Sequence, residues 1–171
     1  IMKRMMLMVV AAMMATLSLS AQEAGDFAIG PHVTYRFKSQ TYAPGIRVQY
    51  SLTDWLRVEA VGDYWLKKDN WEAFDAMVNV HGLFHVSQFF KIYPIAGVGY
   101  FQTKLNELDY TDPEYGVHVH FNGKTTNDLV GVGGLGLQLN FTDHFAMNVE
   151  MKYQYNVGNQ YCATAGLLYF F

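Results

Sequence analysis

The chain has 171 residues, with 12 Lys and Arg against 15 Asp and Glu and a formal net charge of −3. This length predicts one domain, and the acidic balance argues against a nucleic-acid partner. The single cysteine, Cys162, excludes an internal disulfide, a common stabiliser of small exported domains.

The first 21 residues predict a secretory signal peptide. The basic residues Lys3 and Arg4 precede an apolar run that ends near Leu17, and small residues follow. We expect cleavage after Ala21, which leaves residues 22–171 as one domain. No later apolar run reaches the roughly 20 residues of a membrane-spanning helix. A closed β-barrel is the other structure that satisfies its backbone in lipid.

Eight later segments alternate apolar and polar residues with the two-residue period of a β-strand. MNVEMKYQYN (147–156) shows the alternation without error. In a soluble sandwich or barrel the apolar face points inward, whereas in an outer-membrane barrel it faces lipid. Most segments run about 10–14 residues, close to the tilted span of a bilayer. The predicted strands are 26–37, 42–52, 56–66, 74–86, 90–103, 129–141, 145–156 and 161–171.

The connections alternate between short and long, as in bacterial outer-membrane barrels. The turns 53–55, 87–89 and 142–144 have three residues each and begin with Thr or Ser, whereas 104–128 is a long loop. A three-residue turn brings apolar residues opposite apolar ones along each hairpin, and a one-residue slip would reverse every face. The predicted pairs are Leu52–Leu56, Val86–Phe90, Phe141–Phe145, Tyr50–Val58, Phe84–Ile92, Leu139–Met147, Gln49–Glu59 and Gln138–Asn148.

Aromatic residues gather at the ends of the apolar face, and aliphatic residues occupy its middle. Segment 145–156, for example, has Phe145 and Tyr153 near its ends and Val149 between them. Two aromatic girdles around an aliphatic belt are typical of a barrel in a bilayer. A soluble core has no reason to sort its aromatic residues by depth. We therefore predict that the apolar face contacts lipid.

The polar face would then fill the lumen. Eight strands leave an interior just wide enough for side chains to fill, and an unpaired charge in a dry interior is costly. We therefore expect a plugged lumen with paired charges, Arg47 with Glu59 first among them, and Gly134 and Gly136 opposite longer side chains. The predicted lumen charges are Arg36, Arg47, Arg57, Glu59, Asp63, Asp75, Lys91, Glu150 and Lys152, with His32, His81, His85 and Cys162 on the same face.

The C-terminal YCATAGLLYFF and the runs IYPIAGVGYF (92–101) and GVGGLGLQLNFTDHFAMNVEMKYQY (131–155) resemble the OmpA/OmpX-like outer-membrane β-barrel domain. The resemblance implies an all-β, eight-stranded antiparallel up-and-down transmembrane barrel with both termini in the periplasm. It also implies an assembly signal, read by the barrel-assembly machinery, at Tyr161, Leu167, Tyr169 and Phe171. Because the sequence ends at Phe171, we expect no periplasmic peptidoglycan-binding domain.

No catalytic, cofactor-binding or metal site is predicted. GVGGLG (131–136) lies within a strand without a following helix, so it is not a nucleotide site. His118 and His120 share one strand face but lack the further ligands that a metal needs. The second hypothesis is an outer-membrane lipid-modifying barrel enzyme, an acyl hydrolase or acyltransferase. Its nearest candidate pair is His85 and Ser87, for which the register supplies no carboxylate. The third is a soluble exported lipocalin-like binder.

The long loop is the main functional candidate, because function concentrates in loops carried on a rigid scaffold. VHVHF (117–121) predicts a hairpin that extends beyond the membrane. We expect a structural or adhesive protein of a Gram-negative outer membrane, in contact with lipid and with an extracellular ligand or surface partner. A solvated loop without a partner is the alternative. The candidate binding residues are Glu107, Asp109, Tyr110, Asp112, Glu114, Tyr115, His118 and His120.

Overall fold

A computed structural model of the chain describes residues 24–68, 71–105, 108–111, 114, 116, 118–121, 123–156 and 158–171. The predicted signal peptide lies outside the described residues. Within them, the structure contains no helix that is both long enough and apolar enough to cross a membrane.

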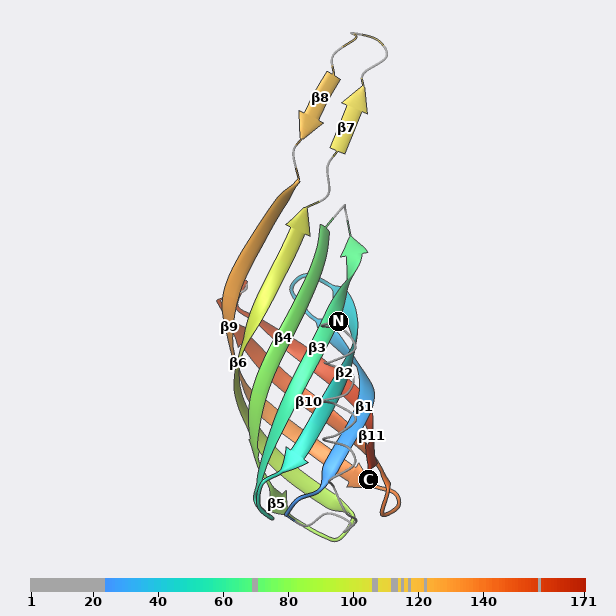
Figure 1. The fold of residues 1–171 in the computed structure, drawn as a ribbon, viewed down its shortest axis with the longest axis vertical. Coiled ribbons are helices and arrows are strands. Elements are labelled where there is room, and N and C mark those ends of the chain that lie inside the picture. Colours follow the sequence, from blue (N-terminus) through green and yellow to red (C-terminus); the bar gives the residue numbers. More distant parts are fainter. Residues whose placement is uncertain are drawn as a thin grey trace, which may run out of the picture.

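The described residues form two sheets. The strands are β1 (Phe27–Arg36), β2 (Thr41–Ser51), β3 (Leu56–Lys68), β4 (Trp71–Gly82), β5 (Phe84–His85), β6 (Phe90–Leu105), β7 (Leu108–Thr111), β8 (His118–Phe121), β9 (Lys124–Asn140), β10 (Phe145–Tyr155) and β11 (Gln160–Phe170). The large sheet has the order β4-β3-β2-β1-β11-β10-β9-β6-β5, and pairing of β4 with β6 closes it into a barrel. The two-stranded sheet β7–β8 rises above one end of the barrel (Figure 1).

The predicted eight-stranded antiparallel barrel is therefore confirmed, and one predicted strand is interrupted. Segment 74–86 forms β4 and the short β5, separated at Leu83. Both pair with β6 in a single register, since His81 lies opposite Ile95 and Phe84 lies opposite Ile92. That register places Pro94 across from Gly82, the last residue of β4, and a proline cannot donate to a sheet ladder. The Leu83 N–H faces the other neighbouring strand and donates to the Trp55 carbonyl oxygen at 2.7 Å, which continues the register of β3 with β4.

All three short hairpins have the predicted register. The turn ends are joined by backbone hydrogen bonds from Leu52, Val86 and Phe141 to the carbonyl oxygens of Leu56, Phe90 and Phe145, at 2.9, 3.1 and 2.9 Å. The ladder pairs Tyr50↔Val58, Phe84↔Ile92, Leu139↔Met147, Gln49↔Glu59 and Gln138↔Asn148 are also as predicted. Gly134 and Gly136 lie opposite Lys152 and Glu150. Equal three-residue turns therefore fix which residues face inward.

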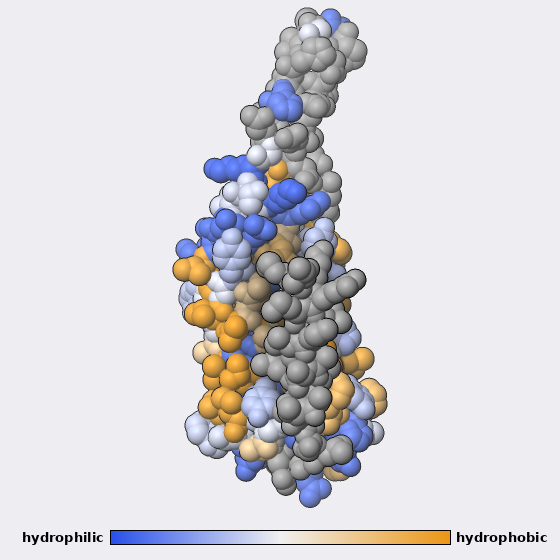
Figure 2. Space-filling view, viewed as in Figure 1, coloured by the Kyte–Doolittle hydropathy of each residue, from blue (hydrophilic) through white to orange (hydrophobic). Residues whose placement is uncertain are grey.

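The apolar face of the barrel points outward. In β10, Val149 and Met151 are 45% and 49% exposed, whereas the intervening Glu150 and Lys152 are 1% and 4% exposed. Hydrophobic residues gather over the barrel wall in the space-filling view, with hydrophilic residues below and above them (Figure 2). A soluble β-barrel would have the opposite arrangement. This orientation rules out the soluble lipocalin-like alternative.

The seam between the first and last strands depends on a glycine. β1 pairs with β11 at Ile29↔Tyr169 and again from His32↔Gly166, but not at Pro31, which faces Leu167 and has no N–H. The Leu167 carbonyl oxygen lies against Gly30 so closely that a Cβ at position 30 would overlap it. Gly30 therefore lets the two strands meet beside the proline.

Replacing Gly30 with alanine is expected to destabilise the folded barrel by about 1–3 kcal/mol, because backbone lies on both sides of the contact. Gly133→Ala is the matched control, since nothing lies within 4 Å of a Cβ at that position. The free energy of unfolding of both variants is measured by urea unfolding in detergent, with the gel mobility shift of unheated protein as the signal for the folded barrel. Equal unfolding midpoints for the two variants would contradict the close packing at the seam.

Candidate functional site

All nine predicted lumen charges are buried inside the barrel. They come from β1, β2, β3, β4, β6 and β10, at the alternate positions that face inward. The buried residues are Arg36, Arg47, Arg57, Glu59, Asp63, Asp75, Lys91, Glu150 and Lys152. His32, His81 and Cys162 are buried with them, as predicted. His85 is exposed, contrary to prediction, because it lies at the rim where the barrel ends.

Arg47 is the centre of this network. Its Nη1 donates to Glu150 Oε1 at 2.7 Å and to Glu59 Oε2 at 3.3 Å, and all three side chains are fully buried. Lys152 Nζ lies 3.2 Å from the other Glu150 oxygen. The predicted pair of Arg47 with Glu59 is confirmed, and the stronger contact with Glu150 joins β2 to β10 across the lumen.

Neutral side chains also donate hydrogen bonds to the two carboxylates. Glu59 accepts hydrogen bonds from Gln49 Nε2 at 2.6 Å and Asn79 Nδ2 at 2.9 Å. Glu150 Oε1 accepts one from the Tyr93 hydroxyl at 2.8 Å. A buried ion pair is stabilised only when further hydrogen bonds satisfy its oxygens, and these donors come from β2, β4 and β6. The network therefore links β2, β3, β4, β6 and β10.

Arg57 extends the network along β3 and β4. Its Nε lies 3.1 Å from His81 Nδ1, and its Nη1 donates to Gln138 Oε1 at 2.6 Å. The guanidinium also lies 4.8 Å from the centre of the Tyr93 ring, which stacks on His81. Neutral acceptors and an aromatic face thus surround this cation. The charged residues of the sequence did not point to these partners. The alternation that places the partners on the lumen face is the signal that could have identified them.

A second group lies nearer the β7–β8 end. The Arg36 guanidinium lies 3.6 Å from the centre of the Trp65 ring and 4.5 Å from that of Phe101, and its Nε donates to Gln154 at 2.9 Å. Arg36 Nη2 is 4.0 Å from Asp75 Oδ2, which accepts the Trp65 indole N–H at 2.7 Å. Aromatic rings, more than the carboxylate, therefore stabilise Arg36.

Part of the lumen is apolar, which the sequence analysis did not predict. One inner cluster contains Ala43, Val61, Trp65, Met77, Leu83, Tyr93, Ile95, Phe101, Val130 and Val132. A smaller cluster contains Ala28, Ala146, Leu168 and Phe170. These residues occupy the same inward-facing positions as the charged residues. The alternation of each strand therefore already placed them on the inner face. Charged and apolar side chains therefore lie side by side on the inner face of the barrel.

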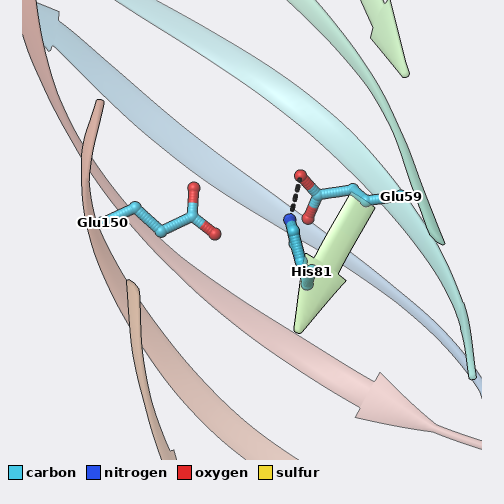
Figure 3. Close-up of side chains that lie close together, drawn as sticks. All are labelled: Glu59, His81 and Glu150. Carbon is cyan, nitrogen blue, oxygen red and sulfur yellow. Dashed lines mark ion pairs between the residues drawn. The ribbon is translucent and has the colours of Figure 1, made fainter. Parts of the chain in front are cut away.

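Glu59, His81 and Glu150 come close enough together to be tested as a metal site. Their candidate ligand atoms lie within 4.8 Å of one another (Figure 3). Arg47 Nη1 already contacts both carboxylates, and Arg57 contacts the His81 ring. A divalent cation would meet these positive charges at contact distance in a low-dielectric interior. The three residues fit an ion-pair network and do not fit a metal centre.

The predicted assembly signal faces outward, and the described residues of the predicted binding loop lie at the β7–β8 hairpin. Tyr161, Leu167, Tyr169 and Phe171 are all exposed on the outer face. Asp109 and Tyr110 lie in β7 and His118 and His120 in β8, with Asp109 opposite His120. Glu114 and His120 are exposed, and Glu107, Asp112 and Tyr115 lie outside the described residues. The structure thus brings the described loop residues into one hairpin.

Ser87, the candidate nucleophile of the enzyme hypothesis, has a role in its turn. Its hydroxyl accepts the Phe89 N–H at 3.3 Å. Thr53 and Thr142 accept the corresponding N–H groups of Trp55 and His144 at 3.3 and 3.2 Å. The same contact at three turns indicates a structural function for the hydroxyl residue.

Residues 7–168 match the family model of the outer membrane protein beta-barrel domain. The chain belongs to this family. It is a protein of the bacterial outer membrane, in contact with outer-membrane lipid through its apolar wall. No curated protein sequence matches it.

Solved structures share its fold at low sequence identity. The N-terminal β-barrel domain of Pseudomonas aeruginosa OprF is 15% identical, with a TM-score of 0.64 over 87% of this chain and 98% of that one. Ail, the attachment invasion locus protein of Yersinia pestis, is 13% identical, with a TM-score of 0.56 over 85% and 97%. Neisserial surface protein A is 12% identical, with a TM-score of 0.56 over 84% and 94%. At these identities the likeness concerns the fold alone.

Removing the Arg47 guanidinium is expected to destabilise the barrel by about 3–5 kcal/mol, because it leaves Glu59 and Glu150 without their shared cation. Arg47→Met tests this in urea unfolding. Adding Glu150→Gln should recover part of the loss, which a double-mutant cycle measures.

Lys38→Met is the control, since Lys38 is exposed and donates a hydrogen bond to the Gly158 carbonyl oxygen in a loop at 2.8 Å. A loss at Arg47 no larger than that of the control would contradict a central role for the buried network.

Proposed function

We propose that the protein is a non-enzymatic barrel with a plugged lumen, which displays the β7–β8 hairpin outside the cell in a structural or adhesive role. The observation that carries the proposal is the hairpin itself, which projects beyond the barrel on two long strands (Figure 1). β6 and β9 pair continuously from Phe90↔Leu139 to Leu105↔Lys124. A ladder of this length supports a rigid display of the loop.

The chemistry of the hairpin restricts its partner. The segment 104–128 contains Glu107, Asp109, Asp112 and Glu114 together with Tyr110 and Tyr115. Acidic and tyrosine side chains suit a partner with positive charge or hydrogen-bond donors. One solved structure of Yersinia pestis Ail is a complex with the heparin analogue sucrose octasulfate. A polyanion of that kind would be repelled by the acidic hairpin of this chain.

The packed lumen supports a closed barrel. Arg47 spans from β2 to Glu150 on β10, and Tyr93 reaches the same carboxylate from β6. An ion crossing the lumen would have to displace buried charge pairs, which is costly in a low-dielectric interior. We also propose that the outer-face residues Tyr161, Leu167, Tyr169 and Phe171 are recognised by the barrel-assembly machinery during insertion.

Replacing residues 106–123 with Asn-Gly should leave the barrel folded and abolish binding at the cell surface. Asn-Gly suits a two-residue hairpin turn, and it would join Leu105 to Lys124, which are already paired. Adhesion of a non-adherent laboratory bacterium displaying each variant to epithelial-cell monolayers measures the effect.

A Gly-Ser segment of equal length in place of 106–123 controls for loop length, and the gel mobility shift of unheated protein controls for folding. Adhesion above background by intact protein that persists in the Asn-Gly variant would reject the hairpin as the binding element. Background adhesion by the intact protein would reject the adhesive role and leave the structural one.

The purified protein should produce no stable porin-sized conductance steps in planar bilayers, because buried side chains occupy the lumen. A general porin inserted under the same conditions is the positive control. Reproducible steps of porin size from the folded protein would reject the plugged lumen.

A further inference from the structure

The barrel wall is open between β2 and β3 in the half nearer the hairpin. Their ladder extends from Ser51↔Arg57 to Gly45↔Asp63 and stops there. Beyond that point β2 pairs only with β1, up to Arg36↔Thr41, and β3 pairs only with β4, up to Lys68↔Trp71. The two strands therefore share no ladder pair beyond this point, whereas β2 stays paired with β1, and β3 stays paired with β4 apart from a bulge between Trp65 and Lys68.

Pro44 gives the end of the β2–β3 ladder a physical cause. The ladder between β1 and β2 continues through Val33↔Pro44, so the side on which Pro44 lacks a donor is the side that faces β3. The missing N–H falls one residue beyond the last pair, Gly45↔Asp63. The strands do not pair again above it.

The opening lies at the depth of the aromatic girdle. Tyr42 on β2 and Tyr64 and Leu66 on β3 border it, and all three are exposed on the outer face. Tyrosine in an outer-membrane barrel marks the interface between the hydrocarbon and the headgroups. The opening therefore faces the headgroup level of the outer leaflet.

A pocket of about 220 Å³ lies at the opening, beside the mouth of the barrel. Thr41 on β2 and Leu66 on β3 line it from the two sides of the opening, and Trp65 and Phe101 line it from the lumen. Arg36 also lines the pocket, is 5% exposed, and has an Nη2 atom without a hydrogen-bond partner within the described part of the chain. A buried guanidinium N–H without an acceptor is a costly arrangement.

We propose that this pocket binds the carboxylate of a single-chain acyl amphiphile, such as a long-chain fatty acid, at Arg36. The acyl chain leaves between β2 and β3 into the outer leaflet. A carboxylate would give Arg36 Nη2 the charge-assisted hydrogen bond that Asp75, at 4.0 Å, does not supply. Glu72 also lines the pocket and disfavours headgroups with more than one negative charge.

Size also favours a ligand that extends out of the pocket. Clefts that enclose a whole drug-sized ligand have volumes of roughly 300–1,000 Å³, and this pocket is smaller. It holds a headgroup and the first carbons of a chain, and the opening provides the exit for the rest. This site is separate from the β7–β8 hairpin, so it extends beyond the proposed adhesive role.

Trp65 supplies a direct reporter, because it is 3% exposed and contacts the Arg36 guanidinium. The chain has three tryptophans, and the double variant Trp55→Phe with Trp71→Phe keeps only Trp65. In phosphatidylcholine nanodiscs, 2-bromopalmitate carries its quenching bromine beside the carboxylate. We expect saturable quenching of Trp65 that oleate reverses and acetate at the same concentration does not.

The control protein keeps Trp55 alone, through Trp65→Phe and Trp71→Phe. Trp55 lies in the turn at the opposite end of the barrel, so its quenching should rise without saturation as the probe partitions into the bilayer. Arg36→Gln should weaken the saturable quenching about tenfold, as expected for a lost charged hydrogen bond. Arg36→Lys should retain most of it.

Pro44→Val tests the opening separately, because it restores the donor that faces β3. We expect weaker binding of 2-bromopalmitate in a barrel that still shows the gel mobility shift. The Asn-Gly replacement of 106–123 should bind 2-bromopalmitate as well as the protein with the intact hairpin does, which separates this site from the hairpin.

Non-saturable quenching of Trp65, or equal quenching in Arg36→Gln, would overturn the proposal. Competition by acetate as effective as that by oleate would overturn the acyl-chain part.

Discussion

The structure depends on one constraint, which is that a backbone in lipid must find all its hydrogen bonds within the protein. The chain meets it by returning its last strand, β11, to its first, β1, so that the large sheet has no free edge through most of its height. Once the sheet closes, the two-residue period divides every strand into a lipid face and a lumen face. The outward position of Val149 and the burial of Glu150 both follow from this closure.

Closure creates a second requirement, because the polar residues of eight strands are brought together in a narrow interior. Arg47 meets it by sharing one guanidinium nitrogen between Glu59 and Glu150, which lie on strands far apart in the sequence. Neutral donors and the apolar cluster around Trp65 and Phe101 are buried beside these charges. The buried charges therefore act as cross-links between strands of the barrel.

The fold could be predicted from the sequence because its determinants are local. Period-two alternation and three turns of equal length fix the register without knowledge of long-range contacts. The partners inside the lumen could not be predicted in the same way, because strand alternation gives the face of a residue and not its height or its neighbour across the barrel. Arg36 lies between aromatic rings, and His85 is exposed at the rim although its alternation assigns it to the lumen.

The barrel accommodates the missing backbone N–H groups of its prolines in different ways. Beside Pro31 the seam pairs again within two residues, because Gly30 admits the Leu167 carbonyl oxygen. Across from Pro94 the strand continues as β5 in the same register. Only beyond Pro44, of these three, do the neighbouring strands stay apart, and there the wall has reached the aromatic girdle. Unpaired backbone groups are tolerable at that depth because headgroups and water can bond them, so an opening toward the bilayer can persist in a wall that is elsewhere closed.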